Sequence, residues 1–378
     1  MILPGATLGV LGGGQLGQMF ALAARRLGFH VWVLDPDPCC PAGGVAHRHL
    51  CAPLDDRWAL EELCRSTAAI TVEMEHIPPE TLEFCDRHGT LRPGLRALRI
   101  AQDRRLEKGF FHGLGLPTAP FAVIGEGPET EDAQKAVPFP AILKTAREGY
   151  DGRGQAHVEN PAQLEAARAA LGTVPAVLEG RVSLALEISV ILARGEDGMA
   201  VFFPVAENHH HRGILDLCIV PARCDGALQT RARQMALQIA EALAYVGVLA
   251  VEFFVTEDGQ LLVNEMAPRP HNSGHYTLDA CVQSQFDQQV RTLCGWPLAD
   301  TRLLSPAVMM NLLGDLWLDH GDPGWFPATA HPQVKPYLYG KSGARRGRKM
   351  GHATILAPSL EGALAIAGDL RRTWNWPR

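Results

Sequence analysis

Two glutamates in the second half of the 378-residue chain have the spacing of a paired-carboxylate site. Alternating hydrophobicity on both sides of a Glu-Asp-Gly turn predicts a β-hairpin over residues 249–265. With the turn centred on 257–260, Glu252 and Glu265 face each other with Cβ atoms about 5 Å apart. Like charges so close need a counter-charge, and Mg²⁺ carrying ATP phosphates would supply it, with Asn264 alongside. The alternative is a register shift that turns one glutamate into solvent.

A second chemical signal is a charged, glycine-rich loop at residues 147–155, after a predicted strand that ends at Lys144. Backbone amides of such a loop can close over a polyphosphate, and Lys144 supplies a point charge for phosphate oxygens. The GxxxxGK[ST] pattern of a Walker loop is absent. A flexible hairpin tip with a solvated lysine is the alternative.

The third signal lies near the N-terminus, where Gly12-Gly13-Gly14-Gln15-Leu16-Gly17 satisfies GxGxxG. Asp35 follows at about the distance of a ribose-binding acid, so an NAD(P) oxidoreductase is one interpretation. Helix N-terminal amides attract any phosphate, so another anion site is a second interpretation. Glycines used only for close β-α packing are the third.

These residues require an α/β opening followed by mixed α+β elements. Thr7–Leu11, Gln15–Leu27 and Val31–Leu34 predict a parallel β-α-β unit, and Ala69–Val72 predicts a further strand. Glu73 and Glu75 follow that strand, at the carboxyl end where open α/β sheets bind ligands; helix-start or surface carboxylates are equally good interpretations. A turn-rich joint near 113–120 places a domain boundary shortly before it.

Composition narrows the class of protein. The formal net charge is −6 and charged residues make up 20%, which argues against a nucleic-acid surface as the main function. The nine cysteines include no CxxC pair, so reduced thiols in a cytoplasmic protein are expected rather than a disulfide framework or a zinc site. No run of 18 apolar residues predicts a membrane span, and the N-terminus has no basic segment typical of a signal peptide.

Together, the strand lysine, the glycine loop, Glu179 with Glu187, and the acidic hairpin resemble the ATP-grasp superfamily. Three strings are similar to those of the N5-carboxyaminoimidazole ribonucleotide synthetases: residues 149–155 (GYDGRGQ), 264–275 (NEMAPRPHNSGH) and 347–352 (GRKMGH). The resemblance runs from near residue 7 to near residue 355. It implies a doubly wound N-terminal pre-ATP-grasp domain (1–100), a two-lobed ATP-grasp domain (101–298) and a small β-rich C-terminal domain (299–378).

The resemblance also assigns roles to residues. ATP would be held by residues of the central domain: Arg104, Lys144, Gly149, Tyr150, Asp151, Gly152, Arg153, Gly154, Gln155, Glu179, Gly180, Arg181, Val182, Glu187, His210, Asn264 and Glu265. Within this set, residues 179–182 would meet the adenine edge and Glu187 the ribose. Glu252 and Glu265 would hold Mg²⁺. The histidine assignment is uncertain by one position, because residues 209–211 are all histidine.

The carboxylation site would be lined by Lys144, Arg269, His271, Asn272, Ser273 and His275. The ribonucleotide would be bound by Gly14, Gln15, Leu16, Glu73, Glu75, Tyr339, Lys341, Arg345, Arg348 and Lys349, which accounts for the basic cluster near the C-terminus.

The resemblance implies ATP- and bicarbonate-dependent carboxylation of 5-aminoimidazole ribonucleotide through carboxyphosphate, in purine biosynthesis, by a homodimer. A formate-dependent glycinamide ribonucleotide transformylase is the nearest rival, but its related Pro-Arg-Pro-His string typically continues Asp-Thr-Gly where this chain has Asn272-Ser273-Gly274. The NAD(P) oxidoreductase leaves the flap and the hairpin unexplained. A nucleotide-binding regulatory protein would not need both metal glutamates.

Overall fold

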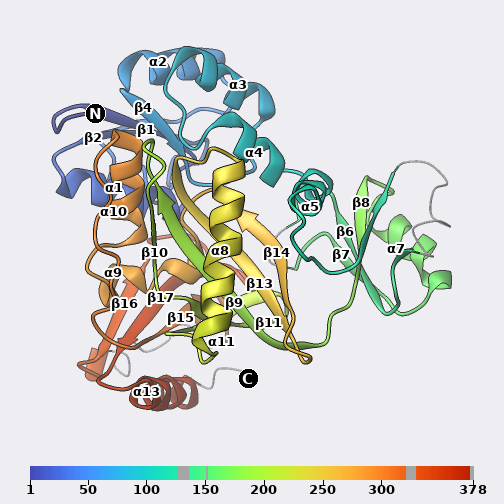
Figure 1. Ribbon diagram of the computed structural model, residues 1–378. Coiled ribbons are helices and arrows are strands. Elements are labelled where there is room, and N and C mark those ends of the chain that lie inside the picture. The colour runs from blue at the N-terminus through green and yellow to red at the C-terminus, as the bar shows by residue number, and fades with distance from the viewer. Residues whose placement is uncertain (126–135, 150–151, 321–328, 375–378) are drawn as a thin grey trace.

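The computed structural model describes residues 1–125, 136–149, 152–320 and 329–374. A four-stranded parallel sheet forms the N-terminal domain, drawn in blue at the top of Figure 1. Its strands, in spatial order, are β3 (Arg48–Leu50), β2 (His30–Leu34), β1 (Thr7–Leu11) and β4 (Ala69–Val72). The predicted parallel β-α-β opening is therefore confirmed. All four residues of β4 are buried, as expected for a strand covered on both faces.

Helices cover both faces of this sheet. On one face, α2 (Arg57–Ser66) and α3 (Pro79–His88) pack against the apolar residues of the strands. On the other, α1 (Gln15–Arg26) packs together with α10 (Gln285–Cys294), which comes from more than 200 residues further along the chain. The sequence analysis did not predict α10, although Ser284 and Asp287 form a capping box at its start.

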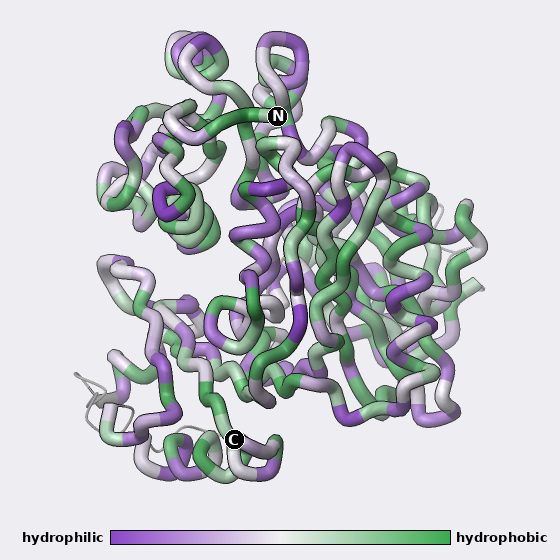
Figure 2. Tube along the Cα trace, turned by 60° about the vertical axis from the view of Figure 1, so that its left-hand side comes forward, coloured by the Kyte–Doolittle hydropathy of each residue, from purple (hydrophilic) through white to green (hydrophobic). Residues whose placement is uncertain are grey.

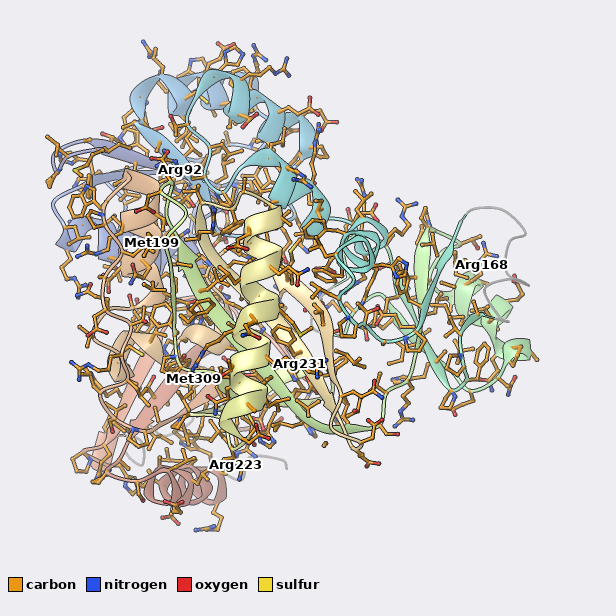
Figure 3. All side chains as sticks on the ribbon, viewed as in Figure 1. Arg92, Arg168, Met199, Arg223, Arg231 and Met309 are labelled. Carbon is orange, nitrogen blue, oxygen red and sulfur yellow. The ribbon has the colours of Figure 1, made fainter. Side chains whose placement is uncertain are left out.

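Two helices, α4 (Leu95–Ala101) and α5 (Arg104–Gly113), connect this domain to a small lobe on the right of Figure 1. The lobe is an antiparallel sheet of β5 (Phe121–Ile124), β8 (Ala176–Gly180), β6 (Ala141–Thr145) and β7 (Gln155–Val158), in that order. The short helix η1 (Pro161–Gln163) and α7 (Leu164–Ala170) cover it. Arg168, labelled in Figure 3, lies on α7 and donates to the Gly125 carbonyl oxygen at 2.9 Å.

The third unit is a nine-stranded sheet that carries most of the site. Its path runs β14 (Leu261–Ala267), β13 (Gly247–Thr256), β9 (Leu184–Arg194), β11 (Ala206–His211), β12 (Ile214–Val220), β15 (Ala307–Leu313), β17 (Lys349–Leu356) and β16 (Val334–Leu338), with β10 (Ala200–Phe202) on β9. The helix α8 (Gly226–Ala242) packs on its strands around the largest apolar core. Figure 2 shows the hydropathy of each residue along the chain trace, with apolar and hydrophilic stretches alternating.

The C-terminal strands continue this same sheet, because β15 pairs with β12 from Leu217↔Met310 to Val220↔Ala307. The predicted β-rich C-terminal segment therefore continues the sheet of the central domain. The helices α11 (Asp315–His320) and α13 (Leu360–Thr373) belong to this segment, and α13 packs on β15 and β17. The short elements η2 (Asn272–Gly274) and α9 (Thr277–Ala280) lie between β14 and α10. Among the described residues, no helix has both the length and the hydrophobicity needed to cross a bilayer.

Candidate active site

The acidic hairpin forms as predicted, with Glu252 of β13 directly opposite Glu265 of β14. This pairing depends on a change of register within the hairpin that the sequence analysis did not predict. Nearer the turn, Phe253 pairs with Val263, and a bulge at Asn264 then advances the register by one residue. Without that bulge Glu252 would face Asn264. The bulge therefore creates the carboxylate pair.

The two carboxylates differ in their charge environment. Burial, followed by the charge of Glu265, raises the pKa of Glu252 to about 7. Burial also opposes ionisation of Glu265, but Arg104, whose Nη1 lies 3.0 Å from Glu265 Oε2, outweighs it and lowers the pKa of Glu265. Among the described residues, the buried Asn264 Oδ1 has no hydrogen-bond partner. Two facing carboxylates are a donor pair that suits a hard divalent cation.

Helix α5 contributes a charged stripe beside the hairpin, made of Arg104, Glu107 and Lys108. Arg104 also donates through Nη2 to the Gly149 carbonyl oxygen at 2.9 Å, which ties the helix to the flap. Glu107 accepts the Met266 backbone N–H at 2.7 Å, and burial, then Glu265, raises its pKa to about 8. The sequence analysis predicted Arg104 and missed Glu107 and Lys108. Their i, i+3, i+4 spacing from Arg104 is the signal that could have found them.

Two lysines converge on Glu179 where the small lobe meets α5. Lys144 Nζ lies 2.9 Å and Lys108 Nζ 3.5 Å from Glu179 Oε2, and all three side chains are buried. Burial disfavours the Glu179 carboxylate, but Lys144 and Lys108 hold its pKa at about 2. The Glu179 side chain therefore lies against the lysines, so a contact with an adenine edge at this position would come from the backbone. Gly180 follows in β8, and Arg181 and Val182 lie just beyond it.

The histidine run separates into distinct environments. His210 Nδ1 lies 2.8 Å from Glu187 Oε2, whereas His209 Nε2 lies 2.7 Å from Glu207 Oε1 on the same strand. Burial opposes protonation of His210, but Glu187 and then Glu252 raise its pKa to about 9. His210 is thus the histidine that joins the predicted nucleotide-binding residues, and it is cationic at neutral pH.

The segment after β14 places His271 next to the acidic hairpin. Its Nδ1 accepts the Ser273 backbone N–H at 3.3 Å, and Ser273 Oγ lies 2.9 Å from the same nitrogen. The Nε2 position therefore carries the proton, and it faces Glu252 Oε1 at 3.6 Å. Burial, followed by the charge of Arg269, lowers the pKa of His271 to about 3. His271 is thus a neutral hydrogen-bond donor here.

The flap crosses from the small lobe toward the large sheet. Gly152 and Gly154 adopt φ of 78° and 65°, a region that favours glycine. A Cβ on Gly152 would lie 3.3 Å from the Arg212 carbonyl oxygen, and one on Gly154 would lie 2.5 Å from Thr145 Oγ1. Gln155 begins β7, and Arg153 lies between the two glycines; Tyr150 and Asp151 fall outside the described residues.

Known protein families match all three parts of the chain. Three family models match the chain: a ribonucleotide synthetase preATP-grasp domain at residues 5–102, an ATP-grasp domain at 109–286, and a phosphoribosylaminoimidazole carboxylase C-terminal domain at 307–365. The N5-carboxyaminoimidazole ribonucleotide synthase of Bacillus subtilis (strain 168) is 44% identical over 94% of this chain and 93% of its own length. The chain belongs to the N5-carboxyaminoimidazole ribonucleotide synthase family.

Solved structures of this family have the same fold. The Staphylococcus aureus synthetase complexed with ADP superposes with a TM-score of 0.91 at 37% identity, covering 99% of this chain and 98% of that one. The Aspergillus clavatus synthase in complex with ADP and 5-aminoimidazole ribonucleotide gives a TM-score of 0.90 at 29% identity, covering 98% of each chain. The predicted fold class and family are therefore confirmed.

Side-chain carboxylates of the protein itself accept hydrogen bonds from the backbone N–H groups of the first glycine loop. Asp35 Oδ2 accepts the Gly13 N–H at 2.7 Å, so the acid that suggested a dinucleotide ribose holds the loop instead. Glu73 accepts the N–H groups of Gly14 and Gly17 at the start of α1, where Gln15 and Leu16 also lie. With the family known, the NAD(P) oxidoreductase interpretation is wrong. The contact of this loop with a substrate phosphate stays a prediction.

Glu75, predicted with Glu73 at the ribonucleotide, is bonded to Arg269 in the structure, and its contact with the ribonucleotide stays a prediction. Its two carboxylate oxygens accept from Arg269 Nε at 2.5 Å and Nη2 at 2.9 Å. Burial disfavours the ionised form, but Arg269 holds the pKa of Glu75 at about 2. The geometry therefore assigns Glu75 to the arginine of the predicted carboxylation site, because both oxygens are already bonded there.

The remaining predicted residues fall into a buried group and a group that is partly or fully exposed. Tyr339 and His275 are fully buried; the Tyr339 hydroxyl lies 3.0 Å from His352 Nδ1, and the His275 ring lies 4.9 Å from that of His352. Asn272 is also buried, between His271 and Ser273. Direct ligand contacts by these side chains stay predictions.

The second group lies in the turn before β17 and at the first residue of that strand, Lys349. Lys341 Nζ donates to the Lys349 carbonyl oxygen at 3.1 Å, and Arg348 donates to the carbonyl oxygens of Ser342 and Gly343. Arg345 is exposed in the same turn. Burial raises the pKa of Glu73, and the charge of Lys341 opposes that rise. Burial and Arg269 lower the pKa of His271, and the charge of Lys349 adds to that effect, so both lysines lie within electrostatic reach of the site. The predicted phosphate-binding lysines are thus brought to the boundary between the first and last domains.

Proposed function

We propose that this chain catalyses the ATP- and bicarbonate-dependent carboxylation of 5-aminoimidazole ribonucleotide to N5-carboxyaminoimidazole ribonucleotide. The observation that carries the proposal is the pair Glu252 and Glu265, held opposite each other beside Arg104 and His271. Such a set suits phosphoryl transfer, where positioning and charge stabilisation do most of the work. The relatives that share the fold along the whole chain bear the name of this activity.

The nucleotide would lie between the small lobe and the large sheet. Lys144, Arg104 and the flap amides would meet its phosphates, and Glu187 would meet the ribose hydroxyls. Glu252 and Glu265, with Asn264 Oδ1, would hold Mg²⁺. The facing register of the two glutamates and the raised pKa of Glu252 support a cation at that point. The metal would supply charge neutralisation for the phosphate oxygens when bound.

The reaction would then proceed in two steps. A bicarbonate oxygen attacks the γ-phosphorus of ATP, the bond from that phosphorus to the ADP oxygen breaks, and carboxyphosphate forms. The exocyclic amine of the ribonucleotide then bonds to the carboxyl carbon, directly or after CO₂ is released. Inorganic phosphate leaves and the amine loses a proton. Arg269 would stabilise the developing negative charge, and the neutral His271 would donate a hydrogen bond. The closed flap would exclude water from the reactive intermediate.

The proposal is tested by measuring ADP release with Mg²⁺ and ATP in separate mixtures. Stimulation by bicarbonate together with 5-aminoimidazole ribonucleotide, and its loss in Glu265→Gln, is the expected result. Stimulation only by formate with glycinamide ribonucleotide would favour the transformylase reaction instead. No turnover in any mixture would contradict both ligase functions.

The physical setting of this activity is part of the same proposal. A cytoplasmic homodimer without a nucleic-acid partner is expected from the resemblance and the acidic net charge. Light scattering of the purified chain tests the dimer, and a single-chain mass would contradict it.

A further inference from the structure

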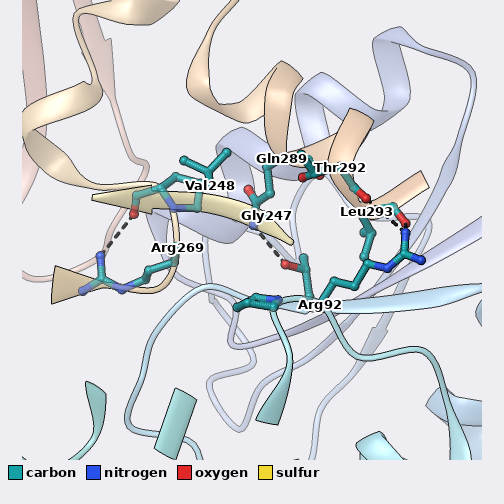
Figure 4. A pocket seen from close by; sticks show the side chains of 10 residues that line it. Arg92, Gly247, Val248, Arg269, Gln289, Thr292 and Leu293 are labelled. Carbon is teal, nitrogen blue, oxygen red and sulfur yellow. Dashed lines mark hydrogen bonds between the residues drawn. The ribbon is translucent and has the colours of Figure 1, made fainter. Parts of the chain in front are cut away.

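Arg269 is held on two sides, which determines what it can still bind. Glu75 accepts hydrogen bonds from Arg269 Nε and from one Nη2 hydrogen. The Pro270 carbonyl oxygen accepts from Arg269 Nη1 at 3.1 Å, and Figure 4 draws this contact. A guanidinium has five N–H bonds, so one Nη1–H and one Nη2–H remain on its outer edge. Among the described residues, no further acceptor is bonded to that edge. Two parallel donors are the arrangement that binds a planar oxyanion in bidentate fashion.

The Glu75 backbone is itself fixed. Gln102 Nε2 donates to the carbonyl oxygens of Glu75 and Ile77, each at 2.7 Å. Gln102 caps α4 immediately before the α5 segment that carries Arg104 to Glu265. One short joint thus holds both the Glu75 loop and the acidic hairpin.

The strand that leads into Glu75 is anchored as well. Gln289 of α10 donates through Nε2 to Thr71 Oγ1 of β4 at 3.1 Å, beside the narrow pocket behind Arg269. Figure 4 shows this contact, with Arg269 and Gln289 on different walls of the pocket. The carboxylate that orients Arg269 therefore projects from a strand end fixed from two directions.

From these contacts we propose that Glu75 is a positioning residue for Arg269. It turns the free guanidinium edge toward the carboxyl group that is transferred, and Gln102 keeps Glu75 in place. The N-terminal domain would then act on the bicarbonate chemistry and not only on the ribonucleotide. The inference rests on the proposed function for the identity of the oxyanion, whereas the Glu75–Arg269 pairing stands on geometry alone.

The test compares full-length variants in steady-state ADP release with 5-aminoimidazole ribonucleotide present. We expect Glu75→Gln to lower kcat/KM for bicarbonate roughly 10- to 100-fold, because a misaligned group loses its effect on the transition state. The KM for ATP should stay within about twofold, a split that general damage to the fold would not produce. Glu75→Asp should recover part of the loss because it keeps the charge. Glu80→Gln, an exposed carboxylate in the first turn of α3, is the matched control.

A double-mutant cycle completes the test. In the Arg269→Lys background, Glu75→Gln should add little further loss, and the two Tm shifts should be less than additive. A kcat/KM for bicarbonate within twofold of the parent protein, an equal effect on the KM for ATP, or additive Tm shifts would each overturn the inference. If the parent protein shows no bicarbonate-dependent turnover, the proposed function fails, and the Tm cycle still decides whether Glu75 and Arg269 are coupled.

Discussion

Two glutamates of different domains, Glu75 in the loop after β4 and Glu252 within β13, show opposite solutions to burying a carboxylate. Glu75 has a bidentate arginine partner and a pKa held at about 2 by it. Glu252 faces another carboxylate, and burial with that neighbour raises its pKa to about 7. The first carboxylate completes an internal pair, whereas the second leaves a charge requirement that an added cation would meet. Partnered carboxylates orient other groups here, and facing carboxylates mark where a ligand is needed.

The largest effect is expected when one of the two facing carboxylates is neutralised. Glu265→Gln keeps the size of the side chain but removes one of the two charges that would hold Mg²⁺. We expect ADP release to fall roughly 100- to 1,000-fold, because charge stabilisation of the transferred phosphoryl group is lost. A coupled assay for ADP at saturating ATP measures it. Glu257→Gln, at the exposed tip of the same hairpin, is the control and should retain activity. Near-normal turnover in Glu265→Gln would contradict the metal assignment.

A second change removes one of the two cationic partners of a buried carboxylate. Lys108→Met removes one of the two lysines at Glu179 and the donor to the Asn264 carbonyl oxygen. Because a buried charge loses a partner, we expect the free energy of unfolding to drop by about 3 kcal/mol. Urea denaturation measures it. Lys335→Met, a surface lysine paired with Asp279, should change it by less than about 1 kcal/mol. Equal stability of the two variants would contradict the role given to Lys108.

The comparison predicts opposite signs for one isosteric change. A lowered carboxylate pKa adds stability above the unfolded value, which is lost as pH falls through about 2. A raised pKa instead means that stability declines as pH rises from about 4.5 toward 7. At pH 8 with a chelator, Glu75→Gln should destabilise the protein and Glu252→Gln should stabilise it, each by about 1–3 kcal/mol. Thermal unfolding at pH 5 and pH 8 checks both, and shifts of the same sign would contradict the contrast.

The smallest expected effect concerns His210, a cation paired with Glu187 on the strand next to the hairpin. Its pKa is raised to about 9, so its contribution is complete below about 6.5 and disappears as pH rises through 9. Between pH 7 and 9.5 the parent protein should lose about 1 kcal/mol more stability than His210→Gln does. Parallel pH profiles of unfolding would contradict the ion pair with Glu187. His209→Gln is the control on the same strand.

Much of the site could be read from local patterns. The strand, turn and strand signals of residues 249–265 predicted the hairpin, and the glycine spacing of residues 149–155 predicted the flap. Charges that approach from other elements could not be found this way. Lys108 and Glu107 reach the hairpin because α5 crosses beside β14. In the same way, α10 covers one face of a sheet whose first strand lies almost 280 residues earlier in the chain.

The sequence by itself determined the family, the parallel opening and the identity of the facing glutamates, because these depend on short-range periodicity and on long matching strings. Tertiary structure alone decided which hydrogen-bond donor each carboxylate pairs with. Asp35 and Glu73 bond the loop amides, Glu75 bonds Arg269, and the bulge at Asn264 aligns the hairpin. Partner choice for a charge depends on which elements pack together in space and on how far burial removes each group from water, and neither is encoded in local spacing.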